Sequence, residues 1–396
     1  MTSRIRLVFV LMALLLVAVS APSSLLAQPK PYTIDVIVPM SGAGAALGQD
    51  LAAGLNAFEA FANKTGGIRG TPLHFRILDD QTQPTVAVQL LQQGLTDHPA
   101  VVIGGGLTGP AQAMAPFVAK DGPVLYGLTP NLSPPSGGYL FATSAEVRDL
   151  LGVGVTYFKA RGLTKIAVIM TNDASGQTGM AATEASIALP ENKGATIVDR
   201  ESFSNDDVSM DAQAARVQSS GAQAIVLLAS GTAFGTAVHA MYDVGLDLPV
   251  YTSAANLSPV LLERFKAFLP KELLASGPSF FNRNRSGNDP LKKPIDDFYA
   301  ALAAQNINTP IITYAFAWDP ALIVTSGLRA LGPSATSAQL RDYIEKQRRF
   351  PGVQGMYDFT SGDQHGLTID GMLVLRSDPD HLGRVTVVSK QGGFPL

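Results

Sequence analysis

The stretch that decides the fold is Tyr32-Thr-Ile-Asp-Val-Ile-Val-Pro39, which is followed by a helical pattern over residues 47–63. The first part is short and rich in β-branched residues, which favour a buried strand. The second part has apolar side chains at helical spacing, including Leu51, Leu55 and Phe58. A buried strand followed directly by an amphipathic helix is the first half of a βαβ unit.

The same alternation continues along the chain in two series. Short apolar strands alternate with longer helical segments, a pattern typical of parallel sheets covered by helices on both faces. The expected strands are 73–78, 100–103, 124–126, 165–170, 196–200, 224–228 and 250–252. The expected helices are 85–95, 111–119, 146–159, 176–189, 210–219 and 233–244. The predicted fold class is therefore α/β, with two doubly wound parallel-sheet lobes.

The C-terminal part departs from this rhythm. Residues 278–349 are strongly helical in pattern, and residues 353–388 resemble short strands separated by turns. Isolated strands are not stable alone, so we expect this tail to join the edge of an earlier sheet. The chain must then cross between the lobes more than once.

The N-terminus predicts secretion. Arg4 and Arg6 precede a wholly apolar run over residues 7–19, and small residues lead to Ala27. This order is that of a signal peptide, which we assign to residues 1–27, with cleavage after Ser20 as the alternative. The apolar run is shorter than the roughly 20 residues that a spanning helix needs. We expect a soluble protein of the periplasm.

Composition excludes several functions. The chain has no cysteine, so it has no disulfide, thiolate metal site or lipid-bearing cysteine. Its formal net charge of −3 provides no basic surface for nucleic acid.

The most conspicuous local motif is Ile103-Gly-Gly-Gly-Leu-Thr-Gly-Pro110. Gly104, Gly106 and Gly109 satisfy G-x-G-x-x-G, but no acid follows the next strand to hold a ribose, and no P-loop Lys-Ser/Thr is present. We therefore expect no dinucleotide cofactor. A glycine turn before a helix N-terminus, with the Thr108 hydroxyl beside it, instead favours binding of a carboxylate.

Enzymatic motifs are weak. The five histidines share no metal-ligand spacing, and no G-x-S-x-G elbow occurs. Asp79 and Asp80 are adjacent on a strand end and point opposite ways, so they are expected to cap the following turn instead of forming an acid pair. We predict no catalytic residues, metal site or cofactor.

Several blocks of the sequence resemble one known family. They are Ile37-Val-Pro-Met-Ser-Gly-Ala-Gly-Ala-Ala-Leu-Gly-Gln49, Ala62-Asn-Lys-Thr-Gly-Gly-Ile-Arg-Gly70, Asp79-Asp-Gln-Thr-Gln-Pro84 and Gly352-Val-Gln-Gly-Met-Tyr-Asp-Phe359. The chain resembles the leucine/isoleucine/valine-binding protein family, the type I periplasmic binding proteins that supply ABC importers. The resemblance extends in order over essentially all of the chain after the signal peptide.

The resemblance implies an architecture and partners. Lobe one would comprise residues 32–144 and 278–352, and lobe two residues 145–277 and 353–396, joined by a three-strand hinge. A small-molecule ligand would bind between the lobes, and a membrane permease would receive it. The protein would be a monomer.

The resemblance also implies site residues. The hydroxyl that holds the ligand carboxylate falls on Thr108, in the turn that contains Gly106. Thr129, Asn131 and Ser133 compete for the second polar anchor. The aromatic residue that closes over the ligand falls on Trp318, which we expect just before a helix with Pro320 in its first turn. A core position behind the cleft is the alternative for Trp318.

Three positions depart from the family pattern. Leu47 and Ser175 stand where the family has pocket tyrosines. The acid that pairs with an amino acid's ammonium group would lie in residues 251–256, around Ala254, and this segment contains no Asp or Glu. A desolvated ammonium without a partner costs several kcal/mol, unless Asp173 substitutes.

The sequence therefore predicts a binder of a small organic acid, aromatic or branched, in place of a standard amino acid. Leu47, Phe316 and Trp318 would supply apolar contact. A branched-chain amino acid or an amide or urea as ligand, or a sensing role at a membrane receptor, are the alternatives.

Overall fold

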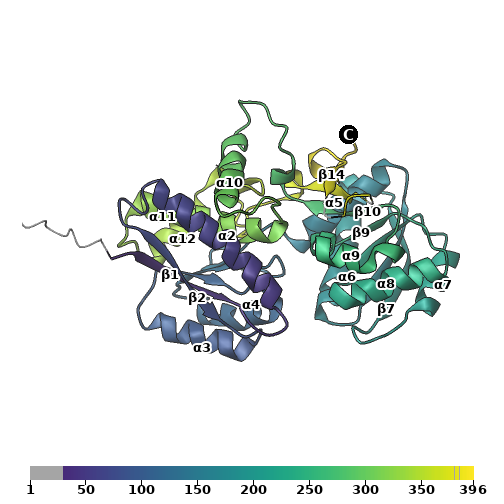
Figure 1. The fold of residues 1–396 in the computed structure, drawn as a ribbon, viewed down its shortest axis with the longest axis horizontal. Coiled ribbons are helices and arrows are strands. Elements are labelled where there is room, and N and C mark those ends of the chain that lie inside the picture. Colours follow the sequence, from purple (N-terminus) through teal and green to yellow (C-terminus); the bar gives the residue numbers. More distant parts are fainter. Residues whose placement is uncertain (1–29, 379, 383) are drawn as a thin grey trace, which may run out of the picture. The chain divides into compact units, whose positions relative to one another are not determined.

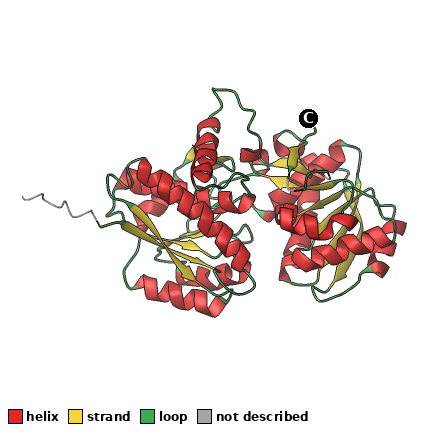
Figure 2. Cartoon of the chain, viewed as in Figure 1, coloured by secondary structure: helices red, strands yellow, loops and turns green. Residues whose placement is uncertain are grey.

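The structure, a computed structural model, describes residues 30–378, 380–382 and 384–396, apart from the side chain of Ala174. The expected signal peptide lies outside the described residues. Two sheets of five and seven strands and a two-stranded ribbon organise the chain, with helices against the strands (Figures 1 and 2). Within the described part, no helix combines the length and apolarity needed to cross a membrane.

The five-stranded sheet has the order β2-β1-β3-β4-β5, and all of its strand pairs are parallel. The strands are β1 (Tyr32–Val38), β2 (Leu73–Asp79), β3 (Val101–Gly104), β4 (Val124–Gly127) and β5 (Leu140–Ala142). The helices that connect them are α2 (Ala45–Lys64), α3 (Pro84–Leu95) and α4 (Thr108–Met114), which continues as the 3-10 turn η1 (Ala115–Phe117). Strand β5 is one that the sequence pattern did not predict.

Alternating side chains of β1 bury against opposite helical layers. Val36 and Val38 belong to the apolar cluster that contains Leu51, Leu55 and Phe58 of α2. Ile37 belongs to a separate cluster with α3 and α4. Strand β1 therefore lies between two layers of helices, as its continuous apolar run predicted.

The seven-stranded sheet has the order β14-β13-β10-β9-β8-β6-β7. Its parallel part consists of β6 (Lys165–Thr171), β7 (Thr196–Phe203), β8 (Ala224–Leu228), β9 (Val250–Thr252) and β10 (Leu273–Gly277). Its helices are α5 (Val147–Ala160), α6 (Ala174–Ile187), α7 (Asp211–Ser219), α8 (Gly231–Asp243) and α9 (Pro259–Phe265), with the 3-10 turns η2 (Pro190–Asn192), η3 (Ala254–Leu257) and η4 (Lys266–Phe268).

The C-terminal tail joins this sheet, as expected. Strands β13 (Leu373–Ser377) and β14 (Val385–Val387) extend it antiparallel beyond β10. The ribbon pairs β11 (Arg348–Pro351) with β12 (Met356–Asp358). The helical stretch before it contains η5 (Ser279–Phe281), α10 (Lys292–Ala304), α11 (Ile312–Leu331) and α12 (Ser337–Glu345), and two further 3-10 turns, η6 (Ile369–Gly371) and η7 (Gln391–Gly393), lie in the tail.

The chain passes between the two sheets three times, after β5, after β10 and after β12. Gln354, in the turn between β11 and β12, contacts the first two of these connections. Its carbonyl accepts from the Ser279 amide at 2.8 Å, and its side-chain amide donates to Thr143 Oγ1 at 3.2 Å. All three residues are buried. One glutamine therefore joins the connections after β5 and after β10 to the β11–β12 turn through hydrogen bonds that are buried from water.

Asp319 of α11 holds the segment that carries Gln354. Its carboxylate accepts from the amides of Val353 and Gln354, both at 2.8 Å, and from the Tyr357 hydroxyl at 2.8 Å. Burial raises the pKa of Asp319 to about 6, against the opposing effect of these three donors.

Helix α11 begins earlier than the sequence predicted. We expected Pro320 in the first turn of a helix, but α11 starts at Ile312 and contains Pro320 in its interior. Proline has no N–H to donate to the carbonyl four residues before it, which is that of Phe316. The Thr143 hydroxyl donates to this carbonyl instead, at 3.0 Å. A tertiary contact thus compensates the proline.

Candidate functional site

The strand order indicates a candidate ligand site at the carboxyl ends of β1 and β3 in the five-stranded sheet. The helix after β1 leads to β2 on one side, and β3 lies on the other side of β1. The loops after β1 and β3 therefore diverge, and open α/β sheets bind ligands at such a place, here called the crevice, outside the carboxyl ends of the strands. The two loops are residues 39–44 and 105–107, which include the glycine-rich motif.

The β1 loop is held by the loop after β2. The Ser41 hydroxyl donates to Asp79 at 2.6 Å, and its amide donates to the same carboxylate at 3.1 Å. The Gly44 amide donates to the hydroxyl of Thr82 at 2.9 Å. These contacts fix the β1 loop before any ligand arrives.

Asp79 and Asp80 cap their own turn, as expected. Asp79 accepts from the Gln81 amide and Asp80 from the Thr82 amide, both at 2.8 Å. Partial burial opposes ionisation of Asp79, yet the hydrogen bonds from Ser41 and Gln81 hold its pKa below the usual value. The two carboxylates serve the loop and form no acid pair.

The β3 loop presents Thr108. Gly105 has a φ of +69°, and a Cβ on it would meet Ala111 at 2.7 Å, so this turn requires glycine. Gly106 is buried, and a Cβ there would meet Leu51 of α2 at 2.6 Å. Thr108 is the first residue of α4, where the helix leaves backbone N–H groups without intrahelical partners.

Asn131 is the competing anchor that the structure brings to Thr108. Its side-chain amide donates to Thr108 Oγ1 at 3.0 Å. Thr129 is buried, and its hydroxyl accepts from the backbone amide of Asn131 at 3.4 Å. Ser133 lines a separate surface cavity with Pro116 and Tyr139. Thr108 and Asn131 therefore form a half-buried polar pair beside the crevice.

Two residues at the start of α2, Leu47 and Asp50, lie near the same crevice. Leu47, in the first turn of α2, is half-buried against the apolar cluster. Asp50, three residues later, is half-buried, and burial raises its pKa. No sequence pattern indicates Asp50, because only the close approach of α2 to the β1 loop shows that the start of this helix lies at the crevice.

The seven-stranded sheet repeats the geometry. Strand β7 lies on one side of β6 and β8 on the other, so the loops after β6 and β8 diverge as those after β1 and β3 do. The loop after β6 contains Asp173, with Ser175 exposed at the second position of α6. The loop after β8 contains Ser230, a position that the sequence patterns did not indicate and that the strand order identifies.

The carboxylate of Asp173 already accepts hydrogen bonds from neighbouring residues. Its carboxylate accepts from the Gly176 amide at 2.9 Å, the Thr171 hydroxyl at 2.9 Å and the Asn205 side chain at 2.6 Å. Burial opposes ionisation, but these donors hold its pKa below the usual value. Ala254 begins η3, after β9, and is half-buried.

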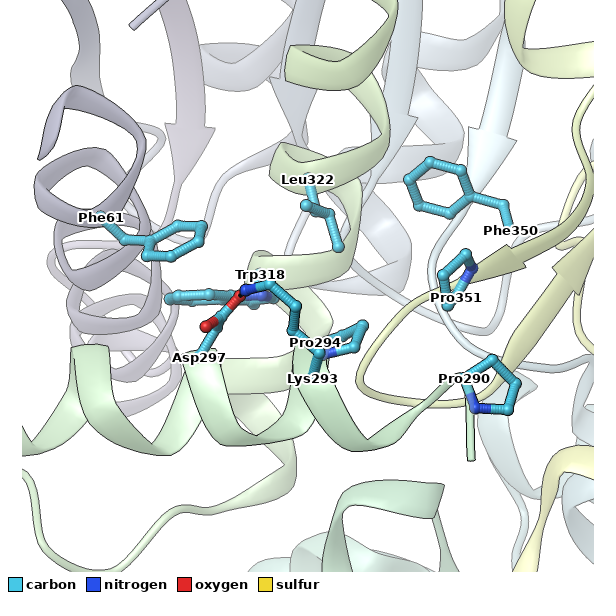
Figure 3. A pocket seen from close by; sticks show the side chains of 9 residues that line it. All are labelled: Phe61, Pro290, Lys293, Pro294, Asp297, Trp318, Leu322, Phe350 and Pro351. Atoms are coloured by element: carbon cyan, nitrogen blue, oxygen red, sulfur yellow. Dashed lines mark hydrogen bonds and ion pairs between the residues drawn. The ribbon is translucent and has the colours of Figure 1, made fainter. Parts of the chain in front are cut away.

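Trp318 does not lie just before a helix, as the sequence predicted. It lies within α11 with 1% of its surface exposed, and its ring contacts Phe58 and Phe298 edge-on at centroid distances of 5.0 and 5.1 Å. It also forms the floor of an apolar surface cavity of about 350 Å³, which Phe61, Leu322 and Phe350 help to line (Figure 3). Trp318 therefore packs in the core within α11, not just before a helix, and its contact with a ligand stays a prediction. A large aromatic side chain is most stable in the core, and the early start of α11 carries it there.

Comparison with known proteins agrees with the fold. The profile of the periplasmic binding protein family matches residues 31–381. A Leu/Ile/Val-binding protein homolog 3 from Brucella melitensis is 26% identical over 310 residues, which cover 77% of this chain and 81% of that protein.

Three solved structures share the architecture. An extracellular ligand-binding receptor from Rhodopseudomonas palustris HaA2 has a TM-score of 0.76 at 20% identity, and a type 1 periplasmic binding protein from Bordetella pertussis Tohama I has 0.74 at 22%; each match covers 91% of this chain and 100% of the other. The substrate-binding protein of a branched-chain amino acid transporter from Streptococcus pneumoniae was solved with isoleucine. Its TM-score is 0.71 at 18% identity, and the match covers 91% of this chain and 99% of the other. The family and the Brucella relative are named as binding proteins, and the Streptococcus pneumoniae structure is named as the substrate-binding protein of a transporter. The chain belongs to the periplasmic binding protein family and has its type I fold.

Proposed function

We propose that this protein binds a small carboxylate without an α-amino group, aromatic or branched, and delivers it in the periplasm to the permease of an ABC importer. The ligand would lie between lobe one (32–144 and 278–352) and lobe two (145–277 and 353–396), against the loops after β1, β3, β6 and β8. A monomer suffices for this role.

The Thr108–Asn131 pair supports the proposal that the ligand is a carboxylate. In their hydrogen bond Thr108 Oγ1 is the acceptor, so the hydroxyl proton of Thr108 is free for a ligand oxygen. The N–H groups at the start of α4 add further donors and a partial positive charge. Together these groups suit an anion at the position that the strand order identifies.

The lack of a free acidic side chain in two segments supports a ligand without an α-amino group. This is the observation on which the proposed ligand class depends. Residues 251–256 contain no Asp or Glu. Asp173, the acid that could substitute, already accepts three hydrogen bonds from side chains and backbone, and a carboxylate has about four acceptor positions. A buried ammonium would therefore meet no free carboxylate in these two segments.

A thermal-shift screen over amino acids, keto acids, aromatic acids, fatty acids and amides tests the proposal. A ligand at 100 times its dissociation constant adds about 2.7 kcal/mol of stability. We expect the largest shifts from acids without an α-amino group, with calorimetry giving the affinities. Tightest binding of leucine or isoleucine would contradict the ligand class, and Asp50→Asn would then test whether Asp50 pairs with the ammonium.

Replacing Thr108 with alanine is expected to weaken ligand binding about ten- to hundredfold. The change removes one donor to a charged group, a contribution of about 1.5–3 kcal/mol. Thr108→Ser keeps the hydroxyl and should retain most of the affinity, which calorimetry measures for both variants. Unchanged affinity in Thr108→Ala, with the fold intact, would place the ligand elsewhere.

A further inference from the structure

One cluster of ligating side chains lies away from the crevice loops. His365 Nδ1 is 3.3 Å from Asp363 Oδ1 and 3.9 Å from Glu146 Oε1. The three ligating atoms lie within 4.8 Å of one another. Glu146 directly precedes α5, whereas Asp363 and His365 belong to the connection between β12 and β13.

Hydrogen bonding explains only part of this geometry. Two carboxylates approach the same ring nitrogen, and that nitrogen carries at most one proton, which it can donate to Asp363. Glu146 is then left facing the ring without a donor from it. The backbone amide of His365 also donates to Asp363 Oδ1 at 2.9 Å and holds this oxygen beside the ring. A cation between the three groups would satisfy the lone pairs that remain.

The other nitrogen of the ring argues against a second proton as that centre. His365 is 1% exposed, and its Nε2 is buried without a hydrogen-bond partner among the described residues. A doubly protonated ring would bury a charged N–H donor without an acceptor, which is costly. A neutral ring that uses Nδ1 as a ligand avoids this buried charge.

We propose that Glu146, Asp363 and His365 bind a divalent transition-metal ion, with Zn²⁺ as the best fit. Zinc takes imidazole nitrogen and carboxylate oxygen at roughly 2.0–2.2 Å in tetrahedral geometry, so its ligands lie about 3.3–3.5 Å apart. The observed 3.3 Å meets this spacing, and the 3.9 Å to Glu146 closes with a small movement of a side chain that is 43% exposed. Mg²⁺ and Ca²⁺ prefer ligand sets of oxygen alone.

The charges around the site favour a cation. Among the residues that the structure describes, Arg148 is the cation in contact with these acids. Its guanidinium donates to Asp149 at 3.0 Å and lies 3.8 Å from Glu146 Oε2, the oxygen away from His365. Glu146, Asp149 and Asp363 against this one arginine leave two net negative charges. Solvent can complete the coordination at the exposed side of Glu146.

The ion would join two segments of the fold. Gln364, between the two ligands of the loop, binds the Gly138 backbone through its side chain and accepts from the Ala142 amide through its carbonyl at 3.1 Å. The loop is therefore fixed against β5, and the ion would fasten the start of α5 to it.

The test uses the mature protein without an affinity tag, stripped with a chelator and titrated with Zn²⁺ by calorimetry. We expect one Zn²⁺ per chain and a higher melting temperature in zinc than in chelator, with no comparable effect of Mg²⁺. Glu146→Gln changes only a partly exposed side chain and should weaken Zn²⁺ binding at least about tenfold. Asp243→Asn is the matched control, because Asp243 contacts His239 at 3.3 Å on an exposed helix face without belonging to the three-residue cluster, and it should leave binding unchanged.

Two outcomes would overturn the site. One is the absence of stoichiometric Zn²⁺ binding by the wild type. The other is equal binding by the wild type and Glu146→Gln, which would show that Glu146 is not a ligand of the ion. Both are independent of the identity of the transported ligand.

Discussion

Replacing Asp319 with alanine is expected to lower the free energy of unfolding by about 3–5 kcal/mol. The change leaves the Val353 and Gln354 amides and the Tyr357 hydroxyl without their acceptor in a fully buried place. Each buried donor without a partner costs about 1–3 kcal/mol. Urea unfolding followed by circular dichroism measures the loss, and a change below 1 kcal/mol would contradict the importance of this contact.

Asp319→Asn is the matched control and adds a pH signature. The amide keeps the volume and one acceptor, but its NH₂ group faces a backbone N–H, so we expect a loss of about 1–3 kcal/mol at pH 7. The pKa of Asp319 is raised to about 6 in the folded protein. Its carboxyl therefore contributes most stability below pH 4 and loses this contribution as the pH rises through 6.

The gap in stability between wild type and Asp319→Asn should consequently widen by about 2–3 kcal/mol between pH 7 and pH 4. Taking the difference between the two proteins cancels the other carboxylates, several of which have lowered pKa values and act in the opposite direction, such as Asp79 and Asp173. A gap that is constant over this range would show that Asp319 does not titrate there.

Gly48→Ala is expected to destabilise the protein by about 3 kcal/mol and to weaken ligand binding. A Cβ on this residue of α2 would overlap the carbonyl group of Pro39, which is backbone and cannot rotate away. Overpacking typically costs 1–3 kcal/mol, and here the chain itself must move. Pro39 begins the β1 loop, so the displacement reaches the candidate site directly.

Gly109→Ala is the control for this change. It is also a helical glycine, but an added Cβ would meet only Pro84 Cγ at an ordinary 3.5 Å. We expect a stability change within about 1 kcal/mol, in the stabilising direction. Equal losses in both variants would show that α2 and the β1 loop do not need their close approach.

The sequence by itself determined the alternation of strands and helices. Strand β9 has the predicted bounds, and α2 and β6 differ from theirs by two residues or fewer at each end. These elements bury continuous apolar runs or one helix face, so local periodicity reflects their environment. The sequence did not predict strands β5 and β10, because so few residues show no periodic pattern that would distinguish a strand from a loop.

Only the tertiary structure decided which residues meet. The convergence of Asn131 on Thr108 depends on the parallel pairing of β3 with β4, and the burial of Trp318 depends on α11 starting at Ile312 before a proline. That helix tolerates Pro320 because Thr143, far away in the sequence, donates to the Phe316 carbonyl. Hydrogen bonds between residues more than a hundred positions apart leave no periodic trace in a single sequence, whereas burial of an apolar face does.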